Sequence, residues 1–300
     1  MLYILNDLLK NDPEIVCIRK LNNRLGNTLN FNNEASLLLD RLSKRNFIIK
    51  VFENNLNDEE FLSRHWKPYE LPRISIYEDE NFSLFYHFFL PVKNFSEDTA
   101  AHLIHDHNNY ILSSYIFYGG GYKAIEFDRI NYFEGHNNNL VINKYLNHSY
   151  KNTYTLNSYT PHVIFNVKGF TASVVLWSNE KESINTKNRI NYFIKEKKII
   201  GYSDSEFISK IEMIDKDSDI HIQSFCYFLQ KLNYKNDLFI KNIIDSKSSN
   251  SKWNKWLDFL LKRNTIKEPV LQSNINTFNS AIKKNSIIEM FRKKILIYND

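Results

Sequence analysis

The pattern of apolar and polar positions changes twice along this chain, near residue 65 and again past residue 182. In the first part, Ala35 to Arg45 places several leucines on one broad face with charged residues opposite, which predicts an amphipathic helix. Asn32 and Asn33 lie just ahead of that segment and are expected to cap it. Phe47 to Phe52 is predicted as a short strand. Residues 1–64 are therefore expected to form a mainly helical segment.

Residues 65–182 are predicted to form a series of short strands. Arg73 to Tyr77 alternates polar and apolar residues, and Phe82 to Val92 is a nearly continuous aromatic and apolar run. Further β-prone runs occupy 110–118, 122–127, 140–145, 154–156, 162–167 and 171–177. The run Gly119-Gly120-Gly121 lacks the spacing of a phosphate-binding loop and is predicted as a tight turn. This series is typical of an antiparallel sandwich or barrel.

The remainder, residues 183–300, is expected to be a helical region. Its apolar residues show i, i+3, i+4, i+7 spacing at Trp253, Trp256, Leu257, Leu260 and Leu261. Helices are also expected across 219–232, 268–284 and 286–297, with a capping box at Ser203 and Glu206. The predicted fold class is α+β with a mainly β core: an antiparallel barrel flanked by N-terminal and C-terminal helices.

Composition fits a folded globular protein. Hydrophobic residues make up 43% of the chain, and its 22 Phe and 18 Tyr favour β-structure and large buried side chains. Two cysteines in 300 residues indicate a reducing compartment rather than a disulfide framework. Met1 to Lys10 do not resemble a secretory signal, and no apolar run approaches the ~20 residues of a membrane span. We therefore expect a cytoplasmic protein with no membrane association.

The positive charge lies mainly in the last fifty residues. Residues 251–300 hold ten Lys and Arg against four acidic residues, whereas the rest of the chain sums to −1. Such a tail can bind nucleic acid or an acidic partner, but no DNA-reading motif accompanies it. We interpret the charges as solvated helix faces, with Trp253 and Trp256 buried, and expect no nucleic-acid partner.

Three histidines carry the candidate chemistry. His105 and His107 are two residues apart in a β-prone stretch, so on a strand they share one face. Two imidazoles on one face form half of a metal site, and a third ligand on a neighbouring strand would complete it. His162, in another β-prone run, is the best candidate for that third ligand. The other histidines, apart from His102, are interpreted as structural.

This pattern resembles the cupin superfamily. The first cupin motif has His-x-His, three or four residues, Glu, six residues and Gly. Here His105 and His107 are followed at that spacing by Leu112, in place of the glutamate, and by Gly119.

The second cupin motif ends in His, three residues and Asn, a spacing that His162 and Asn166 meet. The leading glycine of the first motif is Thr99 here, and the Pro-x-Gly of the second is missing. The resemblance covers roughly residues 70–180 and implies a jelly-roll barrel with a three-histidine metal centre.

The resemblance also implies a reaction class. Three-histidine cupins include oxygen-using iron enzymes, among them thiol dioxygenases, some of which have a tyrosine-crosslinked cysteine where this chain has Leu112. The metal that we expect is Fe(II); imidazole ligands also suit Zn, Ni and Cu, and another divalent metal such as Mn stays possible. Without the carboxylate, the site keeps its full double positive charge and favours a small anionic or chelating substrate together with O2.

Other site residues are predicted from strand parity or nearness in sequence. If Leu112 faces inward, Ser114, Ile116 and Tyr118 share its face. The substrate-binding candidates are Leu112, Ser114, Tyr118 and Asn166, and the catalytic candidates are Tyr159 and Glu126.

Two alternatives to an oxygenase stay open. One is a metal-dependent isomerase or lyase on the same barrel. The other is a non-catalytic ligand-binding or regulatory module whose basic helical tail contacts a partner. The oligomeric state is also open, with a homodimer among the states the sequence allows.

Overall fold

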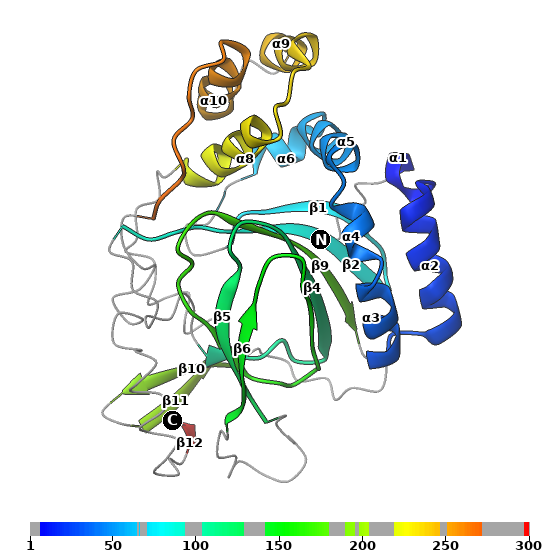
Figure 1. The fold of residues 1–300 in the computed structure, drawn as a ribbon, viewed down its shortest axis with the longest axis vertical. Helices are drawn as coiled ribbons and strands as arrows, with labels where there is room; N and C mark the ends of the chain where they lie inside the picture. The colour runs from blue at the N-terminus through cyan, green and yellow to red at the C-terminus, as the bar shows by residue number, and fades with distance from the viewer. Residues whose placement is uncertain are drawn as a thin grey trace.

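The computed structural model describes residues 7–64, 66, 71–93, 104–128, 142–179, 190–195, 198–203, 219–246, 251–271 and 297–299. They form two mainly antiparallel β-sheets, with helices packed on the outer side of one sheet (Figure 1). For the strands after residue 190, only the backbone is described. Within these ranges, none of the helices has the length and apolar character needed to span a bilayer.

The first sheet has the strand order β1-β2-β9-β4-β7, and its pairs are antiparallel. Its strands are β1 (Arg73–Glu78), β2 (Phe82–Phe89), β9 (Thr171–Asn179), β4 (Tyr110–Tyr118) and β7 (Thr153–Leu156).

The second sheet has the order β12-β11-β10-β3-β8-β5-β6, and its β11–β12 pair is parallel. Its strands are β12 (Ile297–Asn299), β11 (Lys198–Ser203), β10 (Ile190–Lys195), β3 (Ile104–His105), β8 (His162–Ile164), β5 (Tyr122–Phe127) and β6 (Ile142–His148).

The predicted antiparallel β core flanked by helices is confirmed. Strands β4 and β5 match the predicted runs to the residue, and the other runs between 73 and 177 each contain or overlap a strand. In the described part of the chain no hydrogen-bonded strand pair joins the two sheets, so closure into a barrel is not confirmed. The glycine turn between β4 and β5 is confirmed: Gly119 and Gly121 have φ of 84° and 81°. A Cβ at either glycine would collide with a backbone carbonyl, so the turn requires glycine.

The helices fall into an N-terminal and a C-terminal group. The N-terminal helices are α1 (Asp7–Lys10), α2 (Pro13–Leu25), α3 (Leu29–Ser36), α4 (Leu39–Leu42), α5 (Arg45–Leu56) and α6 (Glu59–Ser63). The C-terminal helices are α8 (Ile220–Lys231), α9 (Asp237–Ser246) and α10 (Ser251–Leu261). Helix α8 confirms the helix predicted at 219–232. The predicted helices at 268–284 and 286–297 and the capping box at Ser203 and Glu206 lie wholly or mainly outside the described residues.

The helices and strands predicted for the N-terminal segment differ from the structure at two places. The helix expected over 35–45 is broken between α3 and α4, and Leu37 at the break is 72% exposed. Phe47 to Phe52 is part of α5 rather than a strand. Phe47, Ile48, Val51 and Phe52 are all buried, which is the i, i+1, i+4, i+5 spacing of a helix face. A short apolar run does not distinguish the two structures, and burial against the sheet decides it.

Asn32 and Asn33 were expected to be caps, but both lie inside α3, and Asn32 is a core residue. Thr28 caps α3, because its hydroxyl accepts a hydrogen bond from the Phe31 amide at 3.2 Å. The fully buried Asn32 amide instead donates to the Ile111 carbonyl at 3.2 Å and accepts from the Ser178 hydroxyl. It thereby joins α3 to strands β4 and β9.

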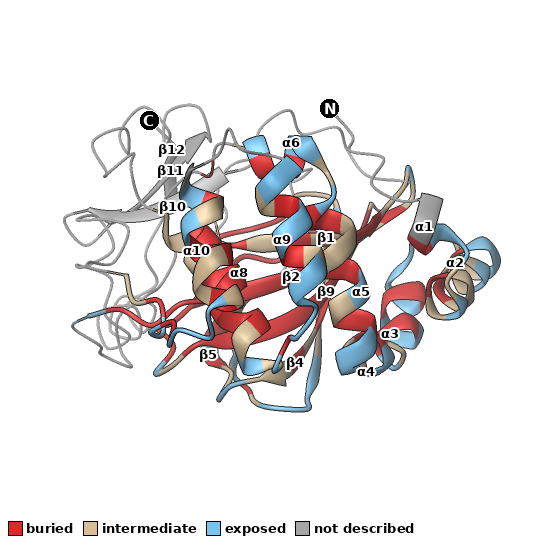
Figure 2. Cartoon of the chain, turned by 90° about the horizontal axis from the view of Figure 1, so that it is seen from above, coloured by how far each residue is buried: buried red, intermediate tan, exposed pale blue. Residues whose placement is uncertain are grey.

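Among the described residues, buried hydrophobic side chains pack on both faces of the first sheet. Leu84, Tyr86 and Phe88 of β2 face the helices and belong to a large core shared with both helical groups. Figure 2 shows α5, α8, α9 and α10 lying over the buried strands β1, β2 and β9. Trp253 and Trp256 are buried in this core, as predicted. The smaller core lies between the two sheets and contains Phe89, Ile116, Tyr122, Ala124, Ile164 and Val167.

Strands β10 and β11 were not predicted, because residues 183–300 were expected to be helical. Their backbones pair antiparallel from Ile190 opposite Ser203 to Lys195 opposite Lys198. Strand β10 also pairs with β3, where Asn191 lies opposite His105. The chain after residue 183 therefore supplies the strands that extend the second sheet beside the candidate histidines.

Candidate metal centre

Strand pairing brings the three candidate histidines together. His105 on β3 lies directly opposite His162 on β8 in an antiparallel pair, so the two side chains share one face of the sheet. His107 follows two residues after His105, beyond the end of β3. The neighbouring strand expected for His162 is therefore present, whereas His107 lies outside the strand on which parity had placed it, and the structure still brings the three histidines together.

The three imidazole rings form a compact triangle. Their centroids are 5.0 Å apart for His105 and His107, 4.4 Å for His105 and His162, and 4.9 Å for His107 and His162. One ring nitrogen from each histidine lies within 4.8 Å of the other two. The side chains are 7%, 9% and 6% exposed, so little water reaches them.

This geometry fits a divalent metal. Nitrogen ligands at about 2.1 Å from a tetrahedral ion are about 3.4 Å apart. Small rotations of the rings would bring the three nitrogens, now within 4.8 Å of one another, to that spacing. Neutral imidazole is a good ligand for several first-row metals, and three of them leave further coordination positions open.

Backbone hydrogen bonds fix the turn that carries His107. The Asp106 carboxylate accepts from the Asn108 amide at 2.7 Å, and the His107 carbonyl accepts from the Tyr110 amide at 3.0 Å. The Tyr159 amide donates to the Asn108 carbonyl at 2.6 Å. This last bond ties the segment that leads into His162 to the turn that follows His107. Tyr159, a predicted catalytic residue, is 5% exposed and contributes at least this backbone contact.

An apolar wall stands beside His107. Leu112 on β4 lies opposite Trp177 on β9, and the Trp177 ring centroid is 4.9 Å from that of His107. Tyr110 extends the wall, with its ring centroid 5.6 Å from that of Trp177. Leu112 therefore lies beside this wall, where the resemblance placed a metal-binding carboxylate. Trp177 was missed by sequence reasoning, because its place depends on the register between β4 and β9.

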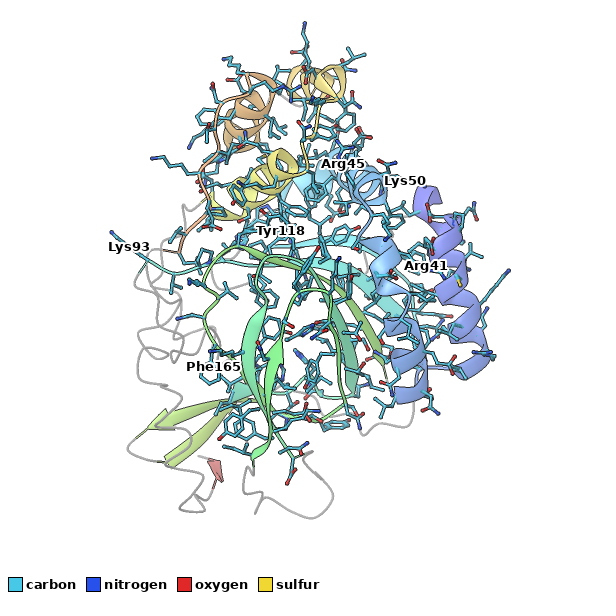
Figure 3. The ribbon with its side chains drawn as sticks, viewed as in Figure 1. Arg41, Arg45, Lys50, Lys93, Tyr118 and Phe165 are labelled. Carbon is cyan, nitrogen blue, oxygen red and sulfur yellow. The ribbon has the colours of Figure 1, made fainter. Side chains whose placement is uncertain are left out.

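The parity argument for β4 holds for Ser114 and Ile116 and is wrong for Tyr118. Ser114 faces the space between the sheets, where its hydroxyl is 3.4 Å from His148 Nδ1, and Ile116 belongs to the core there. A register irregularity between Ile116 and Tyr118 turns the strand. The Tyr118 ring consequently packs against Phe228 of α8, with centroids 5.5 Å apart, at the helix end of the sheet (Figure 3). The basis for a substrate-binding role of Tyr118 is lost. Asn166 is buried, and its substrate-binding role stays a prediction.

Glu126 lies on the same row across the second sheet as His105 and His162, a row being the residues directly opposite one another on neighbouring strands. It lies opposite His162 in the β5–β8 pair, as His105 does in the β3–β8 pair. Its carboxylate accepts hydrogen bonds from Tyr154 and, at 3.0 Å, from Asn143. Burial, and then the Glu126 carboxylate, raise the pKa of Tyr154 well above its usual value. The Lys144 ammonium is 3.2 Å from the same carboxylate.

A second buried polar cluster lies nearby. His148 Nδ1 is 3.2 Å from the Tyr122 hydroxyl, and its Nε2 is 3.0 Å from the Asn152 carbonyl. Burial lowers the pKa of His148 to about 4 and raises the pKa of Tyr122 to about 12. The neutral His148 donates through Nε2 and accepts through Nδ1. The structural interpretation of His148 agrees with these contacts, while His65 and His136 lie outside the described residues.

Comparisons with known proteins give only fold-level likenesses. No protein-family profile and no curated protein sequence matches the chain. Similar solved structures include TT1209 from Thermus thermophilus, at 14% identity over 41% of this chain and 94% of that one, with a TM-score of 0.27. The cupin domain of Schizosaccharomyces pombe Cnp3 matches at 12% identity over 37% of this chain and 64% of that one, with a TM-score of 0.26.

A cupin superfamily protein from Desulfitobacterium hafniense DCB-2 matches at 8% identity over 39% of this chain and 84% of that one, with a TM-score of 0.26. Two of these three structures are thus described as cupins.

Proposed function

We propose that this chain is a cupin-type metalloenzyme in which His105, His107 and His162 bind one divalent metal. The observation that supports this most directly is the convergence of three nearly buried imidazoles from two strands and a turn. Burying three imidazoles together costs desolvation, and coordination of a metal would offset that cost. The metal that we expect is Fe(II), with Zn, Ni, Mn and Cu as the alternatives.

The proposed substrate is a small anion that can chelate the metal. Three neutral imidazoles leave the full double positive charge of the ion, and Leu112 adds no carboxylate to reduce it. A bound Fe(II) would supply a place for O2 and the substrate to meet, which makes oxygenase chemistry our first proposal. The Trp177 ring beside His107, with Leu112 opposite it on β4, would give one side of the reacting group an apolar surface.

A second candidate is a metal-dependent isomerase or lyase, which Glu126 favours. This carboxylate is 6% exposed and stands on the row of His105 and His162. A buried carboxylate on that row could accept a proton from a metal-bound substrate, while Tyr154 and Lys144 hold it in place. This chemistry needs no O2. The two candidates share the metal and differ in the co-substrate.

The metal is tested by replacing its proposed ligands. Protein purified anaerobically should contain about one divalent metal per chain, measured by mass spectrometry of the metals. His107→Ala should weaken metal binding by more than about 100-fold, because even loss of a residue supporting a ligand costs 10- to 100-fold. His221→Phe removes a buried histidine elsewhere and should keep the metal.

Full metal occupancy in His105→Ala, His107→Ala and His162→Ala alike would contradict the assignment. With the metal established, O2 consumption separates the two chemistries. Uptake of O2 that depends on a small carboxylate, enolate or thiolate supports the oxygenase. Conversion of such a compound under strictly anaerobic conditions supports the isomerase or lyase.

A further inference from the structure

A cavity of about 320 Å³ opens where the edge of the first sheet meets helices α5 and α6. A volume of this order is at the lower end of the range for small-ligand sites. Its walls come from β1, β2, β4, β9 and the ends of α5 and α6. Its lining includes Arg64, Arg73, Glu78, Phe85, Tyr110 and Trp177.

One aromatic wall belongs both to this cavity and to the candidate metal centre. Trp177 lines the cavity, and its ring centroid is 4.9 Å from that of His107. Tyr110 also lines the cavity, 5.6 Å from Trp177 between ring centroids. The Trp177 ring therefore stands between a ligand in the cavity and the histidine group.

The charged groups of the cavity favour an anion. Among the described residues two arginines and one glutamate line it, which gives this part of the lining a net charge of +1. The Arg73 guanidinium carbon is 5.2 Å from the centroid of Phe85, another lining residue. The Arg64 guanidinium carbon is 4.6 Å from the centroid of Trp66. Stacking on a ring holds a guanidinium in one plane, the orientation that bidentate binding of a carboxylate requires.

We propose that this cavity is a binding site for a small carboxylate with an aromatic or otherwise planar apolar body. The carboxylate would pair with Arg73 and Arg64, and the body would pack on Phe85, Tyr110 and Trp177. If the histidines bind metal as in the proposed function, on which this step rests, the ligand is the substrate or the end of it that lies away from the metal.

The test uses the full-length chain, freed of metal with a chelator, and 4-fluorobenzoate as the probe. Binding is followed by fluorine NMR, with 4-fluorobenzylamine as the cationic probe of equal size. We expect the carboxylate to bind at least about tenfold more tightly than the amine. Arg73→Gln should weaken the carboxylate about tenfold or more, since it removes a charge-assisted bidentate contact.

Two further variants make the result specific. Arg73→Lys keeps the positive charge but lacks the planar guanidinium group. Its affinity for the carboxylate should lie between those of the wild type and Arg73→Gln. Arg41→Gln is the matched control, because Arg41 lies on α4 among the N-terminal helices, 3.5 Å from Glu14 (Figure 3). It should leave the affinity unchanged. Arg64→Gln serves as a second test if Arg73→Gln fails to fold.

The outcomes also separate this inference from the proposed function. If the carboxylate binds metal-free protein and needs Arg73 or Arg64, the cavity is a carboxylate site, whether or not His107→Ala shows that the histidines bind metal. If the carboxylate binds only after a metal is restored, it goes to the histidines and the cavity proposal is overturned. Equal binding of the two probes, or no effect of either arginine, overturns it as well.

Discussion

Replacing His221 by phenylalanine should change how the stability of this protein depends on pH. His221 lies on α8, is 2% exposed, and stacks on Trp66 with ring centroids 5.6 Å apart and planes 20° apart. Burial, and then the positive charge of Arg64, lower the pKa of His221 from 6.5 to about 3. Phenylalanine retains an aromatic ring against Trp66 and removes the titrating group.

The sign and size of the effect follow from proton linkage. Below pH 6.5 the unfolded chain takes up a proton at His221, whereas the folded protein does so only near pH 3. Above pH 6.5 His221 is neutral in both states, and the wild type has its full stability with respect to this residue. As the pH falls from there toward the folded pKa, the free energy of unfolding decreases by up to about 1.4 kcal/mol per pH unit. Between pH 7 and pH 4 the loss amounts to about 3 kcal/mol, and between pH 7 and pH 5 to about 2 kcal/mol.

The measurement is urea unfolding followed by tryptophan fluorescence, at pH 7, 6, 5 and 4 and constant ionic strength. All groups other than His221 titrate in both proteins, so their contributions cancel in the difference between wild type and variant. From pH 7 to pH 4 we expect the free energy of unfolding of His221→Phe to rise by about 3 kcal/mol relative to that of the wild type. The dependence of the unfolding free energy on urea concentration should be the same for both proteins. Parallel stability curves for the two proteins would refute the burial of a neutral His221.

Two other substitutions test the packing of α3 and the role of Leu112. Asn32→Ala removes buried hydrogen bonds to β4 and β9 and should lower the free energy of unfolding by about 2–3 kcal/mol, seen as a lower urea midpoint; an unchanged midpoint would argue against this junction. Leu112→Glu should leave metal binding intact and reduce turnover, because a carboxylate beside the histidines would take an open coordination position and cancel part of the charge. Metal analysis together with rates would show this, and undiminished turnover would contradict it.

Local patterns were enough to predict much of the β core. Strand β4 and strand β5 were placed to the residue, because continuous β-prone runs are separated there by glycines, two of which no other residue can replace. The helix α5 was mistaken for a strand because Phe47 to Phe52 is a short apolar run that suits either structure. Its identity is decided by contact with the sheet, for example between Phe52 and Phe88, whose centroids are 6.4 Å apart.

The candidate site was predictable only where it depends on parity and spacing. His105 and His107 were grouped by their two-residue separation, and His162 by its place in a second β-prone run. Tyr118 was assigned to the same face as Leu112, because an irregularity in β4 leaves no mark in the sequence. Trp177 and the arginine-lined cavity depend on which strands are neighbours and on where α6 ends, and both are set by tertiary packing.

The relative positions of the three histidines are set by backbone hydrogen bonds rather than by contacts between the histidine side chains. Strand pairing places His105 opposite His162. The hydrogen bond from the Tyr159 amide to the Asn108 carbonyl holds the turn that carries His107. The Phe127 amide donates to the Pro161 carbonyl at 2.9 Å and anchors the same segment to β5. Because these bonds involve no histidine side chain, alanine at His105, His107 or His162 should leave them in place. Loss of metal in those variants can therefore be attributed to loss of a ligand rather than to loss of the fold.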